Sequence, residues 1–187
     1  MAHRQLTGVL LVGGASRRFG SPKALARVGD ETLAERGWRI LGEVCDERIA
    51  VGKTAELDLP FALIDDGTTV RAPIAGVVAA LRAASHDVCV LLPVDCILVP
   101  SSLLVELGLA CRDAAVTQVG PLPGAWSKSA LAVLERRLAG DDLSLKGAYS
   151  ELDVSELHIP EALLADADTP EELARLVTAL SSPTTIV

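Results

Sequence analysis

Short apolar runs alternate with helical patterns along most of this chain, and the alternation limits the fold more than any other feature. The runs have the Val, Ile and Leu content of buried strands, and the segments between them repeat apolar residues every three or four positions. Strand, helix and strand in succession predict the α/β class, with a parallel-rich sheet covered on both faces. Strands are expected at Leu6–Val12, Arg48–Val51, Phe61–Ile64, Asp87–Leu92, Ala114–Val119 and Val154–Ile159. Helices are expected at Thr32–Val44, Pro73–Ala84, Pro100–Cys111, Ser127–Leu138, Leu143–Leu152 and, with Thr169 as N-cap, up to Leu180.

The composition suits such a fold. Half of the residues are hydrophobic but only 3% are aromatic, so the core must be built from Ala, Val, Leu and Ile. Such residues pack helices well on a buried parallel sheet. Trp38 is expected in this core, whereas Trp126, in a turn after a strand, is a candidate for lining a pocket. The four cysteines form no Cys-x-x-Cys pair, so we expect buried thiols rather than zinc ligands or disulfides.

Length and charge limit the organisation and the partners. No linker rich in Gly, Ser or Pro divides the 187 residues, which predicts one domain over residues 1–187 with a frayed tail. The net charge of −8 argues against non-specific binding to nucleic acid or to an anionic membrane. No apolar run approaches the ~20 residues of a membrane span, and no signal-peptide pattern is present. We therefore expect a cytoplasmic protein.

A glycine-rich segment, LVGGASRRFGSPK, spans Leu11–Lys23 and follows the first expected strand. Glycines let backbone N–H groups approach phosphate oxygens, and Arg and Lys side chains neutralise the negative charge. The spacing matches neither the Walker A motif nor Gly-x-Gly-x-x-Gly. A glycine-rich turn alone often binds nothing, but Arg17, Arg18 and Lys23 favour an anion site.

Carboxylates follow two of the expected strands, and ligands in open α/β sheets bind at such strand ends. Asp95 ends a buried strand and lies too far before Pro100 to cap the next helix, which favours a Mg²⁺ ligand. Asp65 and Asp66 either form a turn or bind a ligand, and the residues do not separate these alternatives. Asp168 is either part of the cap of the last helix or a second metal carboxylate.

Four segments, in order, resemble the motifs of the MobA-like nucleotidyltransferase family, and together they extend over nearly the whole chain. Leu11–Lys23 resembles the family's Leu-Ala-Gly-Gly-x-Ser-x-Arg-Met-Gly-x-x-Lys, and Leu91–Asp95 resembles its strand-borne metal aspartate. Ala72–Gly76 resembles Gly-Pro-Leu-Ala-Gly, and Asp166–Leu173 resembles Asn-x-Asn-Thr-Pro-Glu-Asp-Leu. The resemblance implies a Rossmann-like, three-layer fold. It also implies transfer of GMP from GTP to the phosphate of molybdopterin, with release of pyrophosphate.

The resemblance also implies roles for individual residues. The guanine nucleotide would contact Leu11, Val12, Gly13 and Gly14, and one of Asp65 and Asp66 would bind GTP. Arg18 and Lys23 would hold the triphosphate, and Asp95 would hold Mg²⁺ and touch the phosphates. Arg18, Lys23 and Asp95 are thus the expected catalytic residues, and Asp95 and Asp168 the expected metal ligands. GTP and molybdopterin are the implied substrates, and proteins that mature molybdoenzymes are implied partners.

Several positions depart from the family pattern. Ala72 replaces a glycine, Ile97 replaces a common proline, and Asp166 and Asp168 replace asparagines. Paired aspartates also occur in relatives that use CTP or sugar phosphates, whereas Gly13 and Gly14 favour the guanylyl type, because cytidylyl relatives usually read Ala-Ala-Gly in that loop. Three alternatives stay open: CTP as the nucleotide, another phosphorylated acceptor for GTP, and a nucleotide-binding module without catalysis.

Overall fold

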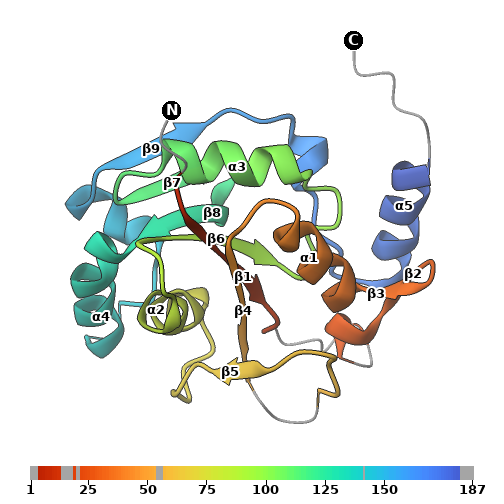
Figure 1. Cartoon of the computed structure of the whole chain (residues 1–187), viewed down its shortest axis with the longest axis horizontal. Coiled ribbons are helices and arrows are strands. Elements are labelled where there is room, and N and C mark those ends of the chain that lie inside the picture. The colour runs from red at the N-terminus through yellow and green to blue at the C-terminus, as the bar shows by residue number, and fades with distance from the viewer. Residues whose placement is uncertain (1–3, 14–18, 20–21, 54–56, 141, 182–187) are drawn as a thin grey trace.

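A seven-stranded sheet forms the centre of the computed structural model, which describes residues 4–13, 19, 22–53, 57–140 and 142–181 (Figure 1). The strand order is β5-β4-β1-β6-β8-β7-β9. The strands are β1 (Leu6–Leu11), β4 (Glu47–Gly52), β5 (Leu63–Asp65), β6 (Val88–Pro93), β7 (Ala114–Thr117), β8 (Gly120–Ser127) and β9 (Val154–Leu157). Neighbouring strands are parallel except for β8, which is antiparallel to both β6 and β7.

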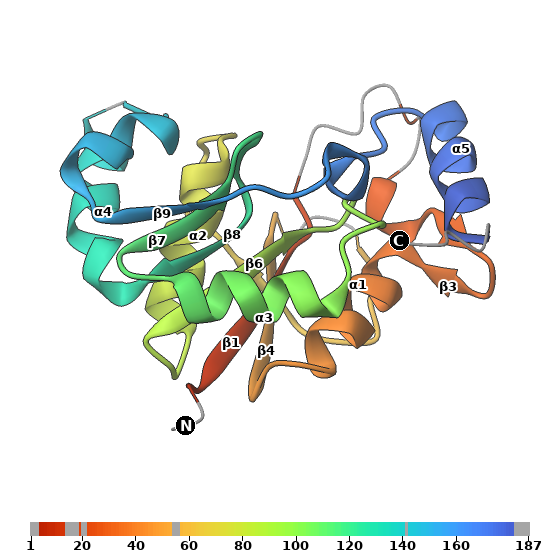
Figure 2. The same cartoon turned by 90° about the horizontal axis from the view of Figure 1, so that it is seen from above.

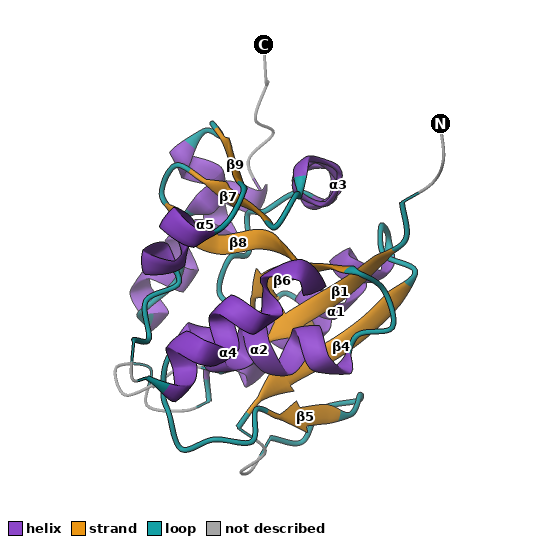
Figure 3. Cartoon of the chain, turned by 90° about the vertical axis from the view of Figure 1, so that its left-hand side faces the viewer, coloured by secondary structure: helices purple, strands orange, loops and turns teal. Residues whose placement is uncertain are grey.

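Helices cover both faces of the sheet, so the predicted three-layer α/β fold is confirmed. Figures 1 and 3 show α2 and α4 together on one face, with α1 and α3 on the other. The α-helices are α1 (Leu33–Gly42), α2 (Pro73–Ala83), α3 (Ser101–Ala110), α4 (Leu131–Ala139) and α5 (Pro170–Ser181). Short 3₁₀ helices are η2 (Lys23–Leu25), η3 (Lys128–Ala130), η4 (Lys146–Glu151) and η5 (Glu161–Leu164), and β2 (Arg27–Val28) pairs with β3 (Glu31–Thr32). In the part of the chain that the structure describes, no helix is both long and apolar enough to cross a membrane.

The central strands are buried on both faces, as their continuous apolar sequence predicts. Leu10 and Leu92 belong to the core cluster under α1 and α3, whereas Val9 and Leu91 belong to the cluster under α2 and α4. Successive side chains of a strand point to opposite faces, so one apolar run supplies both layers. This double burial explains why β1 and β6 read as unbroken hydrophobic runs.

Helix α1 begins with a complete capping box and packs very closely on the sheet. Thr32 Oγ1 accepts a hydrogen bond from Glu35 N at 3.1 Å, and the Glu35 carboxylate accepts one from Thr32 N at 2.8 Å. At Gly37, a Cβ atom would lie only 2.6 Å from Leu10 Cδ1. The missing side chain therefore lets α1 approach β1, which sets the position of every residue on that helix.

The segment after β7 was predicted wrongly. The expected turn at Pro121–Trp126 is part of strand β8, and the helix expected from Ser127 begins with η3, followed by α4 at Leu131. Trp126 does not line a pocket: it is fully buried, and its ring lies 6.4 Å from that of Tyr149. Two smaller corrections follow. The helix expected at Leu143–Leu152 is the shorter 3₁₀ helix η4. Phe61, expected in a strand, precedes β5, and its ring stacks on that of Trp38 with 4.2 Å between the ring centroids.

Candidate active site

Strands β5, β4, β1 and β6 run in the same direction, so their carboxyl ends share one edge of the sheet. Asp65 is the last residue of β5, and Asp95 lies two residues beyond β6. Three strand spacings separate β5 from β6, a span of about 14 Å. Strand β1 lies between β5 and β6 in the sheet, so its carboxyl end lies between Asp65 and Asp95.

The beginning of the glycine-rich segment is held at this edge by the neighbouring strands. Val12 N donates to Val51 O at 2.9 Å, and Leu11 O accepts from Val94 N at 3.1 Å. Leu11 and Val12 are buried, whereas Gly13 is exposed. Gly14 and Arg18, which the sequence also predicts at the site, lie outside the described residues.

Lys23 and three aspartates, of which Asp95 is one, come together just beyond the end of β6. Lys23 Nζ donates to Asp95 Oδ2 at 2.9 Å and to Asp168 Oδ1 at 3.1 Å. Carboxylate oxygens of Asp95, Asp166 and Asp168 all lie within 4.8 Å of one another. The structure thus brings together three predicted site residues from distant parts of the chain, and it adds Asp166.

The environment of Lys23 favours its charged form. Its side chain is only 13% exposed, against 21% for Asp95 and 60% for Asp168. Burial by itself lowers the pKa of Lys23, but hydrogen bonds and charges from Asp95 and Asp168 outweigh it and raise that pKa above its ordinary value. Lys23 is therefore a fixed positive charge in a half-enclosed acidic site.

The backbone and the side chain of Asp168 have different surroundings. Thr169 is the N-cap of α5, as predicted, because its Oγ1 accepts from Glu172 N at 3.2 Å. The Glu172 carboxylate accepts in return from Thr169 N at 3.0 Å and from Asp168 N at 2.8 Å. The backbone of Asp168 belongs to this cap, while its carboxylate bonds to Lys23.

Asp65 and Asp66 form a turn, and they differ in what else they contact. Asp65 Oδ1 accepts from Gly67 N at 2.8 Å, and Gly67 has a φ of +71°, which glycine adopts without strain. Asp66 Oδ1 accepts from Thr68 N at 3.2 Å and also from Lys53 Nζ. The side chain of Asp66 is 9% exposed. Asp65 is the exposed member of the pair.

Residues 8–157 match the family described as the MobA-like NTP transferase domain. The chain belongs to this family. It is 33% identical over 153 residues to a probable molybdenum cofactor guanylyltransferase of Opitutus terrae, covering 75% of this chain and 76% of that protein. It is 29% identical to a probable molybdenum cofactor guanylyltransferase of Chloroflexus aggregans, over 98% of this chain and 99% of that one. The chain is therefore a nucleotidyltransferase.

Solved structures show the same fold. The molybdopterin-guanine dinucleotide biosynthesis protein A of Archaeoglobus fulgidus aligns with a TM-score of 0.77 at 22% identity, over 94% of this chain and 98% of that one. The 2-C-methyl-D-erythritol 4-phosphate cytidylyltransferase of Thermus thermophilus aligns with a TM-score of 0.72 at 17% identity, over 94% and 98%. These two proteins thus share the architecture of this chain.

The acidic cluster has the donor chemistry of a divalent-cation site. Mg²⁺ binds carboxylate oxygens and phosphate oxygens, and three carboxylates here approach one another closely enough to share an ion. Asp95 and Asp168 were predicted from the sequence as metal ligands, and Asp166 was not. The alternation of Asp166, Ala167 and Asp168 was the available signal. Successive side chains of an extended segment point to opposite sides, and Ala167 is fully buried, so Asp166 and Asp168 point the other way together.

A separate cavity of about 320 Å³ lies at the opposite end of the sheet. Its lining includes Arg4, His86 and Asp87, which precede β1 and β6 rather than follow them. It contains none of the predicted site residues. The strand ends and the charged cluster, rather than this cavity, are therefore the candidate active site.

Proposed function

We propose that this chain transfers GMP from GTP to the terminal phosphate of molybdopterin, releasing pyrophosphate and forming molybdopterin guanine dinucleotide. The relatives named above support this assignment. The observation that carries it is the meeting of Lys23 with Asp95, at 2.9 Å, beside the end of β1. These are the family positions from which the resemblance implies triphosphate and metal binding.

In this proposal the nucleotide lies along the carboxyl edge of the sheet. One of Asp65 and Asp66 binds near the base, and Lys23 and Asp95 lie at the triphosphate. The separation of about 14 Å between the two strand ends is of the order of the length of an extended nucleoside triphosphate. Leu11, Val12, Gly13 and Gly14 would contact the nucleotide between them, with Arg18 on the phosphates.

The chemistry needs positioning and positive charge more than a strong base. The pterin phosphate is already an anion near neutral pH, and it attacks the α-phosphorus of GTP in line while pyrophosphate leaves. Lys23 and Arg18 neutralise the charge that accumulates on the transferred phosphate and on pyrophosphate. Asp95 and Asp168, with Asp166 beside them, would hold Mg²⁺, which supplies further charge neutralisation when bound.

The remaining expectations are part of the same proposal. GTP and molybdopterin are the substrates, and proteins that mature molybdoenzymes are the expected recipients of the product. A single domain over residues 1–187 and a cytoplasmic location stay predictions of the sequence.

A second candidate is transfer of CMP from CTP to the same acceptor. The observation that favours it is the pair of carboxylates at Asp166 and Asp168, where the family pattern has asparagines. Gly13 favours the guanylyl reaction instead. The two reactions share the acceptor and the leaving group, so the choice rests on the nucleotide.

A pyrophosphate-release assay with Mg²⁺ and molybdate-loaded molybdopterin tests the proposal by comparing GTP, CTP and ATP. Release with GTP alone is expected. Release with CTP would make the second candidate correct. GTP binding without release from any nucleotide would indicate another acceptor or a module without catalysis, and a second series with other phosphorylated acceptors separates these two.

A further inference from the structure

Helix α1 contacts both partners of the Lys23–Asp95 ion pair through their local backbone. At its start, Leu33 N donates to Ala26 O at 2.8 Å, three residues beyond Lys23. One turn later, Arg36 reaches the segment that carries Asp95: its Nε and Nη2 donate to Ile97 O at 3.4 and 3.3 Å. One rigid helix thus touches both sides of the charged cluster.

The Asp95–Ile97 turn, which we define as these three residues, has few backbone bonds of its own. Ile97 N donates to Asp95 O at 3.0 Å, and Cys96 N donates to Pro93 O at 3.2 Å. The turn must nevertheless hold Asp95 against Lys23 on one side while Cys96 and Ile97 are buried on the other. The half-buried guanidinium of Arg36 donates two hydrogen bonds to Ile97 O, and it thereby holds the turn from outside.

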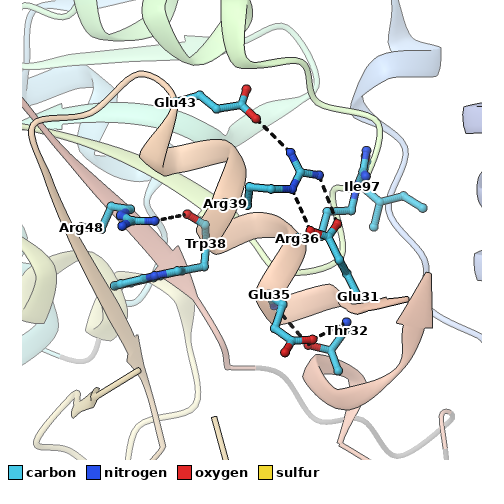
Figure 4. Close-up of polar contacts among 9 residues, drawn as sticks. All are labelled: Glu31, Thr32, Glu35, Arg36, Trp38, Arg39, Glu43, Arg48 and Ile97. Carbon is cyan, nitrogen blue, oxygen red and sulfur yellow. Dashed lines mark hydrogen bonds and ion pairs between the residues drawn. The ribbon is translucent and has the colours of Figure 1, made fainter. Parts of the chain in front are cut away.

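Arg36 differs in this respect from Arg39 on the same helix. Arg39 is 48% exposed and forms ion pairs with Glu31 at 2.7 Å and with Glu43 at 2.9 Å (Figure 4). Figure 4 shows Arg36 beside Ile97 instead. Burial lowers the pKa of Arg36 from its ordinary value, but a guanidinium still stays protonated at neutral pH. The half-buried charge is thus placed against a backbone carbonyl that anchors the turn.

We propose that Arg36 is a positioning residue for catalysis, which acts by fixing the Asp95–Ile97 turn to α1. Gly37 lets α1 pack closely on β1, and this packing fixes the position of Arg36 relative to the carboxyl end of β6. Without the guanidinium, the turn loses these hydrogen bonds to α1, and Asp95 is held less firmly against Lys23. This role rests on the function proposed above, since Asp95 is there a reacting-site ligand.

The chain carries a built-in reporter for this turn. Cys96 is its central residue, and it is 7% exposed. Because the thiol is shielded from solvent, alkylation requires the turn to open. Cys89, on β6, and Cys111, after α3, are also buried and serve as internal references for global unfolding.

The experiment compares Arg36→Met, Arg36→Lys and the matched control Arg39→Met. Iodoacetamide labelling followed by peptide mass spectrometry gives the alkylation rate of each cysteine, and steady-state kinetics give kcat and KM for GTP. In Arg36→Met we expect Cys96 labelling to rise about tenfold relative to Cys89, kcat to fall about tenfold, and KM to change less than threefold. Arg36→Lys should restore part of both effects, and Arg39→Met should match the wild type.

Three outcomes would overturn the proposal. Unchanged labelling at Cys96 would show that Arg36 does not fix the turn, and faster labelling with unchanged kcat would show that the turn does not matter for the reaction. Labelling that rises equally at Cys89 and Cys111 would show a general structural role. The labelling readout needs no substrate, so failure of the proposed guanylyl transfer itself is recognised separately, by a wild-type protein that does not turn over.

Discussion

Replacing Asp95 by Asn removes one charge from the active site at almost constant shape. At 2.9 Å, the attraction between Asp95 and Lys23 amounts to about 6 kcal/mol at an effective dielectric constant of about 20, before desolvation is counted. In a partly exposed pair, most of this attraction is offset by desolvation and screening, and Lys23 keeps its ion pair with Asp168 at 3.1 Å. We expect the free energy of unfolding to fall by only about 1 kcal/mol.

The expected effect on turnover is much larger. Loss of one preorganised electrostatic group in an active site typically lowers kcat by about 10² to 10³-fold, equivalent to about 3 to 4 kcal/mol of transition-state stabilisation. Asp95→Asn should therefore remain folded and lose nearly all pyrophosphate release. Urea unfolding and the release assay with GTP, Mg²⁺ and molybdate-loaded molybdopterin measure the two quantities on the same preparation.

Asp153→Asn is the matched control. It also removes a carboxylate from an ion pair, with Arg112 at 3.0 Å, but both side chains are exposed and lie away from the carboxyl edge of β6. Its kcat should stay within twofold of the wild type. The reasoning is refuted if Asp95→Asn retains wild-type kcat, because Asp95 would then neither hold a metal ion nor fix Lys23 for the reaction.

Three further substitutions test other parts of the structure. Gly37→Ala should lower the free energy of unfolding by about 1 to 3 kcal/mol, measured in urea, because the new Cβ would lie 2.6 Å from Leu10 Cδ1; an unchanged midpoint would contradict the close packing of α1. Asp66→Asn weakens the contact with Lys53 and should raise KM for GTP severalfold in steady-state assays, with kcat nearly unchanged. A fall in kcat with an unchanged KM would argue against a role in ground-state binding. Asp113 has a pKa lowered from its ordinary 3.8 by hydrogen bonds from a serine hydroxyl and a backbone amide, so its ionised form stabilises the fold above that pH, and this stability is lost as the pH falls through the lowered value. Asp113→Asn should accordingly be less stable at pH 7 and decline less below pH 4, and urea midpoints that decline in parallel with the wild type would count against this.

Much of the fold and part of the site could be predicted from local sequence. Strands β1 and β6 are buried on both faces, so their apolar runs are continuous and marked the centre of the sheet. Lys23 and Asp95 were both predicted at the site, because parallel strands end at a common edge, and the structure brings them to 2.9 Å. Thr169 as the cap of α5 followed from the side-chain chemistry of its first turn.

Strand β8 could not be predicted in this way. Its sequence, GPLPGAWS, contains two glycines and two prolines, which normally indicate a turn. A Cβ at Gly124 would lie 2.4 Å from Pro121 O and 3.0 Å from Ala115 O, so glycine is needed there for close approach within the sheet. The approach to Ala115 O arises from pairing with β7, and no local pattern expresses it.

The direction of β7 and β9 explains why Asp166 and Asp168 reach Asp95. Since β8 is antiparallel to β6 and to β7, β7 and its parallel neighbour β9 run in the same direction as β6. The chain leaving β9 therefore emerges at the same edge as Asp95 and continues through η5 into α5, a path that Figure 2 shows from above. Gln118 holds this exit, because its side-chain amide bonds both Ile159 O and Ile159 N, at 2.5 and 3.0 Å. The shared direction of β6, β7 and β9 thus brings two further carboxylates to the ion pair formed by Lys23 and Asp95.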